Sequence, residues 1–365
     1  SFQLINLVVL VATINGVYSD VTIDFNNPLP AVEKGITYPI TKTVYEFRIA
    51  VVSDLETDSK VPGGNNAWYT YYKKGYLTYD PNSEEVSVRW DSGEERGDQY
   101  YTNDANEKGR GFELSEITTF DGHLIAADDQ TGILYVYEKG IFKSWLAVPI
   151  SKENSDADSP DHHPGEVIKE INANGDQPKR TVVMPIEWAT VKDDHLYVGP
   201  NGRDGLNFVA KINKDRQIEF IDWEKNFKAL KSVVGVESGY MVHESCVYSD
   251  VHKKFYLLPK RASEKAFNEE TDNENNSNWL LSLTDENGDK PTVKKEAVIV
   301  QHPDYSDRAY TSFRFIPNSN DNLIVALQSS DKLNATYITV FTIDGKSILN
   351  STKVSDIQYE GLEFI

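Results

Sequence analysis

One layout recurs along this sequence: a short run of hydrophobic and β-branched residues, a polar turn, and a second such run. Four paired runs follow it, namely residues 115–119 with 123–126, 187–191 with 195–198, 244–248 with 255–258, and 312–316 with 323–326. Alternating polarity over about four to eight residues between Asp, Asn and Gly turns predicts β-strands. Some units continue into a third strand, as at residues 133–137 and 337–341. The chain is therefore predicted to be all-β.

The spacing of the units predicts how many there are. Taking Leu124, Leu196, Phe255 and Leu323 as equivalent positions gives separations of 72, 59 and 68 residues. The roughly 320 residues after the N-terminal segment then hold about five units of roughly 66 residues each. The fifth unit is split, with strands at 48–53 and 86–90 and a closing strand at 359–364. Such closure leaves a radial repeat without an open edge, so a five-bladed β-propeller is predicted over residues 45–365. A pair of β-sandwiches is the alternative.

Oxygen-bearing side chains open the first strand of each unit. They include Ser115 in the first unit, Glu187 in the second, Glu244 in the third, Thr311 and Ser312 in the fourth, and Glu360 in the last. The innermost strands of a propeller line its central channel, so these openings are expected to converge. Carboxylates packed together are unfavourable unless a cation lies between them. An oxygen-only ring indicates a hard cation, and its breadth favours Ca²⁺ over Mg²⁺. For each single glutamate, a solvated strand end is the alternative.

Six separated blocks of the sequence resemble one known family. They read RIAVVSDL from Arg48, KKGYL from Lys73, EKGRGFELS from Glu107, DDQTG from Asp128, LLPKRAS from Leu257 and YEGLEFI from Tyr359. In this order they resemble the calcium-activated nucleotidase (apyrase) family, and in character the secreted salivary apyrases of blood-feeding insects. The resemblance implies a five-bladed propeller with Ca²⁺ in the central channel. It also implies hydrolysis of nucleoside di- and triphosphates to the monophosphate and phosphate.

The resemblance further implies which residues bind the metal. The implied calcium ligands are Ser115, Glu187, Glu244, Thr311 and Glu360. Ser312 is the alternative to Thr311, because the family usually has Ser-Ser-Phe where this chain has Thr-Ser-Phe. Gln130 stands where the family usually has a basic residue, so one phosphate contact is expected to be missing.

Phosphoryl transfer needs charge neutralisation on the phosphate and a water in line with the leaving group. Asp54, at the end of an inner strand, and Asp129, in a following turn, are the candidate bases for that water. For Asp129, a turn-forming role in Asp-Asp-Gln-Thr-Gly is the alternative.

Positive charge is needed locally in this acidic chain, whose formal net charge is −20. Lys108 and Arg110 are flanked by glycines that permit close approach, and both are predicted to contact phosphates, Arg110 foremost. Further candidates for the substrate site are Lys260, Arg261 and Arg314 as basic residues, and Trp188 as the ring that stacks on the nucleobase.

Residues 1–19 are predicted to be a signal peptide, because an apolar run at 4–12 is followed by small residues before Asp20. A buried strand is the alternative, and residues 20–44 form an N-terminal segment. Three Asn-x-Ser/Thr acceptors, at Asn275, Asn334 and Asn350, agree with secretion. The lone cysteine, Cys246, excludes an internal disulfide and is predicted to be buried in an inner strand.

These features predict a secreted, extracellular Ca²⁺-dependent apyrase that acts on ADP and ATP. The resemblance implies inhibition of ADP-driven platelet aggregation. The strong negative charge argues against sequence-independent nucleic-acid binding, and no membrane or obligate protein partner is inferred. The alternatives are an organelle-type nucleoside diphosphatase acting on UDP or GDP, a five-bladed glycosidase with structural calcium, and a non-catalytic propeller.

Overall fold

A computed structural model of the chain describes residues 8–12, 18–22, 44–63, 66–93, 95–102, 106, 109–150, 182–203 and 205–365. The chain divides into two compact units, Ser1–Lys42 and Thr43–Ile365. In the first unit, β1 (Val8–Ala12) pairs antiparallel with β2 (Tyr18–Thr22). The rest of the predicted signal peptide (1–19) and nearly all the rest of the N-terminal segment (20–44) lie outside the described residues, so both assignments stay predictions.

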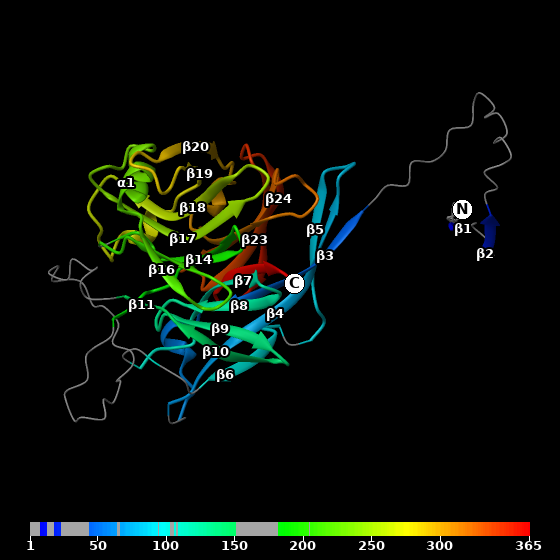
Figure 1. Cartoon of the computed structure of the whole chain (residues 1–365), viewed down its shortest axis with the longest axis horizontal. Helices are drawn as coiled ribbons and strands as arrows, with labels where there is room; N and C mark the ends of the chain where they lie inside the picture. Colours follow the sequence, from blue (N-terminus) through cyan, green and yellow to red (C-terminus); the bar gives the residue numbers. More distant parts are fainter. Residues whose placement is uncertain are drawn as a thin grey trace, which may run out of the picture. The chain divides into compact units, whose positions relative to one another are not determined.

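The second unit consists of antiparallel sheets arranged as the five blades of a β-propeller (Figure 1). Blade 1 contains β7 (Leu114–Phe120), β8 (His123–Asp128), β9 (Ile133–Glu138) and β10 (Ile141–Ala147). Blade 2 contains β13 (Trp188–Lys192), β14 (His195–Gly199), β15 (Phe208–Ile212) and β16 (Ile218–Asp222). Blade 3 contains β17 (Tyr240–Ser249), β18 (Lys254–Ser263), β19 (Trp279–Thr284) and β20 (Thr292–Val298). Blade 4 contains β21 (Ala309–Phe315), β22 (Leu323–Ser330), β23 (Ala335–Thr342) and β24 (Ser347–Ser355).

Blade 5 joins strands from both ends of the unit. Its inner strand β25 (Tyr359–Phe364) pairs with β3 (Tyr45–Ser53), which is followed by β4 (Trp68–Asp80) and β5 (Glu85–Trp90). A further strand, β6 (Asp98–Thr102), pairs with β4. The inner strands contact one another in the closed cycle β7, β13, β17, β21, β25 and back to β7. The prediction of a five-bladed propeller closed by a C-terminal strand is therefore confirmed.

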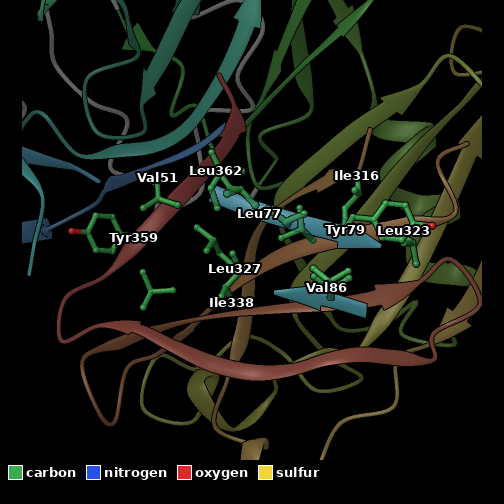
Figure 2. Close-up of a cluster of buried hydrophobic side chains, with 14 of the residues drawn as sticks. Val51, Leu77, Tyr79, Val86, Ile316, Leu323, Leu327, Ile338, Tyr359 and Leu362 are labelled. Atoms are coloured by element: carbon green, nitrogen blue, oxygen red, sulfur yellow. The ribbon is translucent and has the colours of Figure 1, made fainter. Parts of the chain in front are cut away.

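Hydrophobic clusters fill the spaces between adjacent blades. One of them packs Val51, Leu77 and Leu362 of blade 5 against Leu327 and Ile338 of blade 4 (Figure 2). Similar clusters join the other neighbouring pairs of blades. Inner strands have neighbours on both faces, which explains why they are buried over most of their length. Burying a large apolar side chain completely is worth about 1.5–3 kcal/mol, so each interface adds substantially to ring closure.

Cys246 lies in the cluster between blades 2 and 3 and is fully buried, as predicted. The same cluster receives the helix α1 (Glu224–Ser232), which follows β16 and contributes Phe227 and Leu230. Smaller elements are the strand pair β11 (Pro149–Ile150) and β12 (Val182–Val183) and the short helices η1 (Glu56–Ser59), η3 (Asp272–Glu274) and η4 (Pro303–Tyr305). Within the described ranges, no helix combines the length and hydropathy needed to span a membrane.

Candidate active site

A break in strand register lies near the start of the inner strand in four blades. In β7, Leu114 pairs with Asp128 and Glu116 pairs with Ala127, so Ser115 is an additional residue. Corresponding breaks fall at Thr311 in β21, at Glu360 in β25, and between His243 and Cys246 in β17. Such bulges bend a strand and re-aim the side chain that they carry. The irregularities thus coincide with predicted metal ligands.

Blade 2 follows the same pattern at its first residue. Glu187 comes directly before β13 and donates its backbone N–H to the carbonyl of Gly199 at 2.9 Å. Gly199 is also the partner of Trp188 in the sheet, so two consecutive residues share one partner. The break in β17 spans Glu244, which completes the set of five positions.

Two of these residues contact a lysine, and Glu187 lies close enough to interact electrostatically with all three groups. Lys260 Nζ lies 2.6 Å from Glu244 Oε2 in its own blade and 3.4 Å from Glu360 Oε1 in blade 5. Glu187 Oε1 accepts a hydrogen bond of 3.2 Å from Asn201 Nδ2. Blades 3 and 5 are not neighbours in the ring, so the contacts of Lys260 reach across the central axis. We call Glu187, Glu244, Glu360 and Lys260 the channel cluster.

The channel cluster has more negative charge than its lysine balances. Burial, followed by repulsion from Glu244 and Glu360, raises the pKa of Glu187 to about 8. Burial also raises the pKa of Glu360 to about 7, although Lys260 opposes that rise. Burial by itself lowers the pKa of Lys260, but the two glutamates raise it above its ordinary value. Ionised, three carboxylates and one ammonium leave two uncompensated negative charges, which a divalent cation would balance.

The donor set also fits a hard cation. Thr311 is fully buried, and its Oγ1 has no hydrogen-bond partner among the described residues. Ser115 Oγ donates to the carbonyl of Ile186 at 2.5 Å, so its lone pairs remain available. Ser312 Oγ instead lies 3.0 Å from Glu116 Oε1, so it faces a carboxylate outside the channel cluster, and this position favours Thr311 over the alternative ligand. Carboxylate and hydroxyl oxygens are the ligands that Ca²⁺ prefers, so the residues present fit this ion.

A second acidic group lies beside the channel cluster. Asp54, Glu113 and Asp129 offer carboxylate oxygens that all lie within 4.8 Å of one another. Arg110 forms a two-pronged ion pair with Glu113, in which Nε donates to Oε1 at 3.0 Å and Nη2 to Oε2. We call these four residues the rim cluster. The structure thus brings together all three predicted catalytic residues and adds Glu113.

Mutual repulsion also governs the rim cluster. Burial, then the charges of Glu360 and Glu113, raise the pKa of Asp54 well above its ordinary value. Burial, then Asp54 and Glu187, do the same to the pKa of Asp129. Each rim aspartate is therefore repelled by a glutamate of the channel cluster as well as by its own neighbours.

Asp128, next to Asp129 in the chain, has a structural role. Its carboxylate accepts hydrogen bonds from the backbone N–H groups of Phe112 at 2.8 Å and of Thr131 at 2.9 Å. Phe112 has a φ angle of +60°, which is unfavourable for a bulky residue and therefore needs such support. Asp128 thus holds the segment that carries Arg110 and Glu113 against the turn that carries Asp129.

Further along the same inner strands lies another buried group, which we call the lower network. Arg314 of β21 binds Glu363 Oε2 of β25 through Nε at 3.1 Å and Glu116 Oε1 of β7 through Nη2 at 3.2 Å. Arg314 Nη2 also donates to the carbonyl of Ile117. Arg314, considered above as a phosphate contact, is therefore buried in a structural ion-pair network instead.

Comparison with known proteins shows which sequences this chain is similar to. The family model described as Apyrase matches residues 55–365. Soluble calcium-activated nucleotidase 1 of Rattus norvegicus is 34% identical over 90% of this chain and 77% of its own length. The apyrase of Cimex lectularius is 29% identical over 90% of this chain and 86% of its own length. The apyrase of Phlebotomus duboscqi is 28% identical over 89% of both chains.

The chain belongs to the apyrase family. It is therefore a nucleotide phosphohydrolase, as the resemblance of the six sequence blocks implied. Not every predicted substrate contact of this apyrase lies at the channel. Arg261 is ion-paired with Asp272 and Asp331, and Lys260 belongs to the channel cluster. Lys108 lies outside the described residues.

The structure does not support a stacking role for Trp188. Its side chain is completely buried against Trp223 in the cluster between blades 2 and 3. Its Nε1 donates to the carbonyl of Pro200 at 2.9 Å. Because successive residues of a strand face opposite sides, a tryptophan next to Glu187 faces the blade interface when Glu187 faces the channel. Trp188 therefore offers no face to a nucleobase.

Two residues of this apyrase's site were missed from the sequence. Glu113 precedes Ser115 by two positions, and its role depends on the approach of Asp54 from another blade. Asn201 reaches Glu187 only because β13 and β14 pair. The Glu-Lys-Gly-Arg-Gly-Phe-Glu block contains the signal for Glu113, since an Arg and a Glu three residues apart suit a local ion pair.

Proposed function

We propose that this chain is a secreted, calcium-dependent apyrase that hydrolyses ADP and ATP to AMP and phosphate. The observation that carries the proposal is the channel cluster, in which carboxylates from the openings of three inner strands converge beside the three carboxylates and the arginine of the rim cluster. A protein-binding propeller has no need for such an arrangement, since buried like charges destabilise the fold. The names of the rat, Cimex and Phlebotomus relatives support the same activity.

Calcium would be held by Glu187, Glu244 and Glu360, with oxygens of Thr311 and Ser115. Bound there, it would supply positive charge for phosphate oxygens and lower the pKa of a bound water. The divalent charge would also relieve the repulsion that raises the pKa of Glu187 and Glu360.

The residues of the rim cluster have separate roles in phosphate binding and in proton transfer. Arg110 uses Nε and Nη2 to bind Glu113, which leaves Nη1 to bind a phosphate oxygen as negative charge develops there. Glu113 positions that guanidinium. Asp54 and Asp129 lie close enough for one carboxylate to accept a proton from the attacking water while the other stays protonated. A shared proton is the usual result when two buried carboxylates adjoin.

The test is phosphate release from ADP, ATP, UDP and GDP in Ca²⁺, in Mg²⁺ and in chelator. Turnover is expected only with Ca²⁺, because Mg²⁺ requires contacts of about 2.0–2.1 Å that a broad ring does not provide. Glu244→Ala is expected to abolish turnover, and the matched surface control Glu85→Ala to leave it unchanged, since Glu85 is exposed on β5. Equal activity in Mg²⁺ would overturn calcium dependence, and a UDP or GDP preference would favour an organelle-type enzyme.

The proposal also includes secretion of the protein and its role in inhibiting platelet aggregation. The predicted signal peptide supports secretion, as do two acceptor asparagines, Asn334 and Asn350, that are exposed on the propeller. Purified protein is expected to block ADP-induced platelet aggregation in calcium buffer, and Glu244→Ala to lose that effect together with hydrolysis. Inhibition that survives the loss of hydrolysis would mean that the protein acts by binding instead.

A further inference from the structure

Asn201 joins two blades at the channel cluster. Its Nδ2 donates to Glu187 Oε1 at 3.2 Å, and its backbone carbonyl accepts from the N–H of His243 at 2.9 Å. Its Oδ1 accepts a third hydrogen bond, of 3.0 Å, from the backbone N–H of Arg203. Glu187 opens blade 2, and His243 directly precedes Glu244 in blade 3. One asparagine is therefore connected to two channel carboxylates, directly to the first and through a neighbouring residue to the second.

The strand register of blade 2 brings Asn201 to this position. Trp188 of β13 pairs with Gly199 of β14, and the backbone N–H of Glu187 donates to the same Gly199. The chain that leaves β14 therefore passes the residue that opens β13, and Asn201 follows Gly199 by two residues. Trp188 Nε1 also donates to the carbonyl of Pro200 at 2.9 Å, which fixes the residue in between.

Packing on the other side also restricts where Asn201 can lie. Gly202 has a φ angle of +75°, a backbone conformation that favours glycine. A Cβ atom at Gly202 would lie 2.8 Å from the ring of Phe227 in α1, so the ring packs directly on the backbone. The same ring stacks on His243 with centroids 5.3 Å apart. Contacts with blade 2 and with the start of blade 3 therefore both set the position of Asn201.

The three channel glutamates are held by groups of different charge. Glu244 and Glu360 contact the ammonium of Lys260 at 2.6 Å and 3.4 Å. Glu187 accepts its hydrogen bond from a neutral amide instead. An amide orients a carboxylate but leaves its negative charge in place, whereas an ammonium compensates for that charge. Groups that orient a metal-binding carboxylate without touching the metal typically change metal affinity by about 10- to 100-fold.

We propose that Asn201 is a positioning residue, which holds Glu187 in the orientation in which the channel cluster binds Ca²⁺ and leaves the charge of Glu187 free for that ion. This inference rests on the proposed function, because the cation that it concerns is calcium. It assigns a part in calcium binding to a side chain that is not itself a proposed ligand.

The test is calorimetric titration of the chelator-treated protein with CaCl₂, which needs no nucleotide. Asn201→Ser keeps an oxygen for the N–H of Arg203 but is too short to reach Glu187, so the Kd for calcium should rise by about 10- to 100-fold. Asn201→Lys places an ammonium beside Glu187 and should weaken calcium binding further, because it compensates the charge that the ion needs.

Asn213→Ser is the matched control on the same blade. Asn213 Oδ1 accepts from the backbone N–H of Gln217 at 2.9 Å, and its Nδ2 donates to Gln217 Oε1 at 2.9 Å. This asparagine has the same two kinds of side-chain contact, but it lies between β15 and β16 and binds no channel carboxylate. The control is expected to bind calcium as the unmodified protein does.

A double-mutant cycle separates positioning from a general structural role. If Asn201 acts through Glu187, then Asn201→Ser should change the Kd by no more than about twofold in protein that already carries Glu187→Gln. If it only stabilises the local backbone, the two effects should multiply. The midpoint of chemical denaturation in chelator is expected to be the same in Asn201→Ser as in the unmodified protein.

Several results would overturn the role of Asn201. These are an unchanged Kd in Asn201→Ser, effects that multiply in the cycle, tighter calcium binding by Asn201→Lys than by Asn201→Ser, or an equal loss in the Asn213→Ser control. An unchanged Kd beside calcium-dependent ADP hydrolysis would remove this inference alone. A protein that binds calcium with the help of Asn201 but releases no phosphate from ADP would support the inference and contradict the proposed function.

Discussion

The channel cluster and the lower network lie along the same inner strands, yet the buried carboxylates of the two groups differ in how completely their charge is balanced by partners. In the lower network, Arg314 contacts both Glu116 and Glu363, and Ser312 and backbone groups supply further hydrogen bonds. In the channel cluster, Glu244 and Glu360 share the single ammonium of Lys260. Both groups connect blades that are not neighbours in the ring, so their position on the axis is common to them.

The difference teaches that burial of charge does not by itself mark a functional site. A buried carboxylate that has a full set of partners contributes to structure, whereas one that lacks partners favours the binding of a cation. The lower network is expected to govern stability and the channel cluster to govern activity. Variants at Arg314, Arg110 and Glu187 can break or refine this distinction, and one at Glu296 measures the effect of an ion-pair group outside both.

The largest effect is expected from Arg314→Met, which leaves Glu116 and Glu363 buried without their guanidinium. Breaking a buried ion pair by removing one partner destabilises a fold by about 3–5 kcal/mol. Chemical denaturation should report this loss of unfolding free energy, while folded protein keeps its calcium dependence. A loss below about 1 kcal/mol would contradict the structural role assigned to the network.

Arg110→Ala tests whether the rim cluster is separate from metal binding. Removing one preorganised charge donor typically lowers kcat by about 100- to 1,000-fold, and the calcium concentration for half-maximal activity is expected to stay the same. Arg110→Lys keeps the charge but not the two-pronged contact with Glu113, so it should recover only part of the activity. A parallel fall in calcium affinity would mean that the rim cluster also takes part in metal binding.

Glu187→Gln should affect activity and stability in opposite directions. Loss of a charged ligand is expected to reduce calcium-dependent turnover by roughly 100-fold. In calcium-free buffer the same change removes repulsion with Glu244 and Glu360, so the unfolding free energy should stay equal or rise. A clear loss of stability without calcium would place Glu187 with the lower network.

The smallest effect concerns Glu296, at the outer edge of blade 3. Burial alone would raise the pKa of Glu296, but hydrogen bonds from Lys294, Ser282 and Lys254 lower it to about 2. Its ordinary value is 4.5, so its stabilising effect is complete above that pH and is lost as the pH falls from about 4.5 toward 2. Because the group is partly solvated, the effect should stay below about 1 kcal/mol.

The measurement for Glu296→Gln compares unfolding free energies at pH 7 and pH 3. Wild-type protein is expected to lose more stability over this interval than the variant. An equal loss in both proteins would mean that this ion-pair group contributes nothing to acid sensitivity.

The fold could be predicted because strand alternation and turn residues are local signals. The five-unit spacing and the closing strand at residues 359–364 follow from counting along the chain. The burial of Cys246 follows from its place in an inner strand and from the usual burial of a free cysteine. These features depend on properties that each segment carries by itself.

The arrangement of the site could be predicted only in part. The proposed metal ligands Ser115, Thr311 and Glu360 came from the recurring strand openings and from the resemblance to the family. Their place in bulges depends on strand register, which no single strand reveals. Trp188 was misjudged because proximity in sequence was taken for proximity in space. Arg314 was misjudged because a buried cation cannot be told from an exposed one until its partners in other blades are known.

Closure by β25 has a consequence for when activity can arise. A nascent chain emerges from the ribosome N-terminus first, so the strands of blades 1 to 4 are available long before Glu360 is made. Until then β3 lacks its inner partner and the channel lacks one of its three carboxylates. Activity is therefore expected to begin only once β25 has closed the ring, because Glu360 then completes the channel cluster.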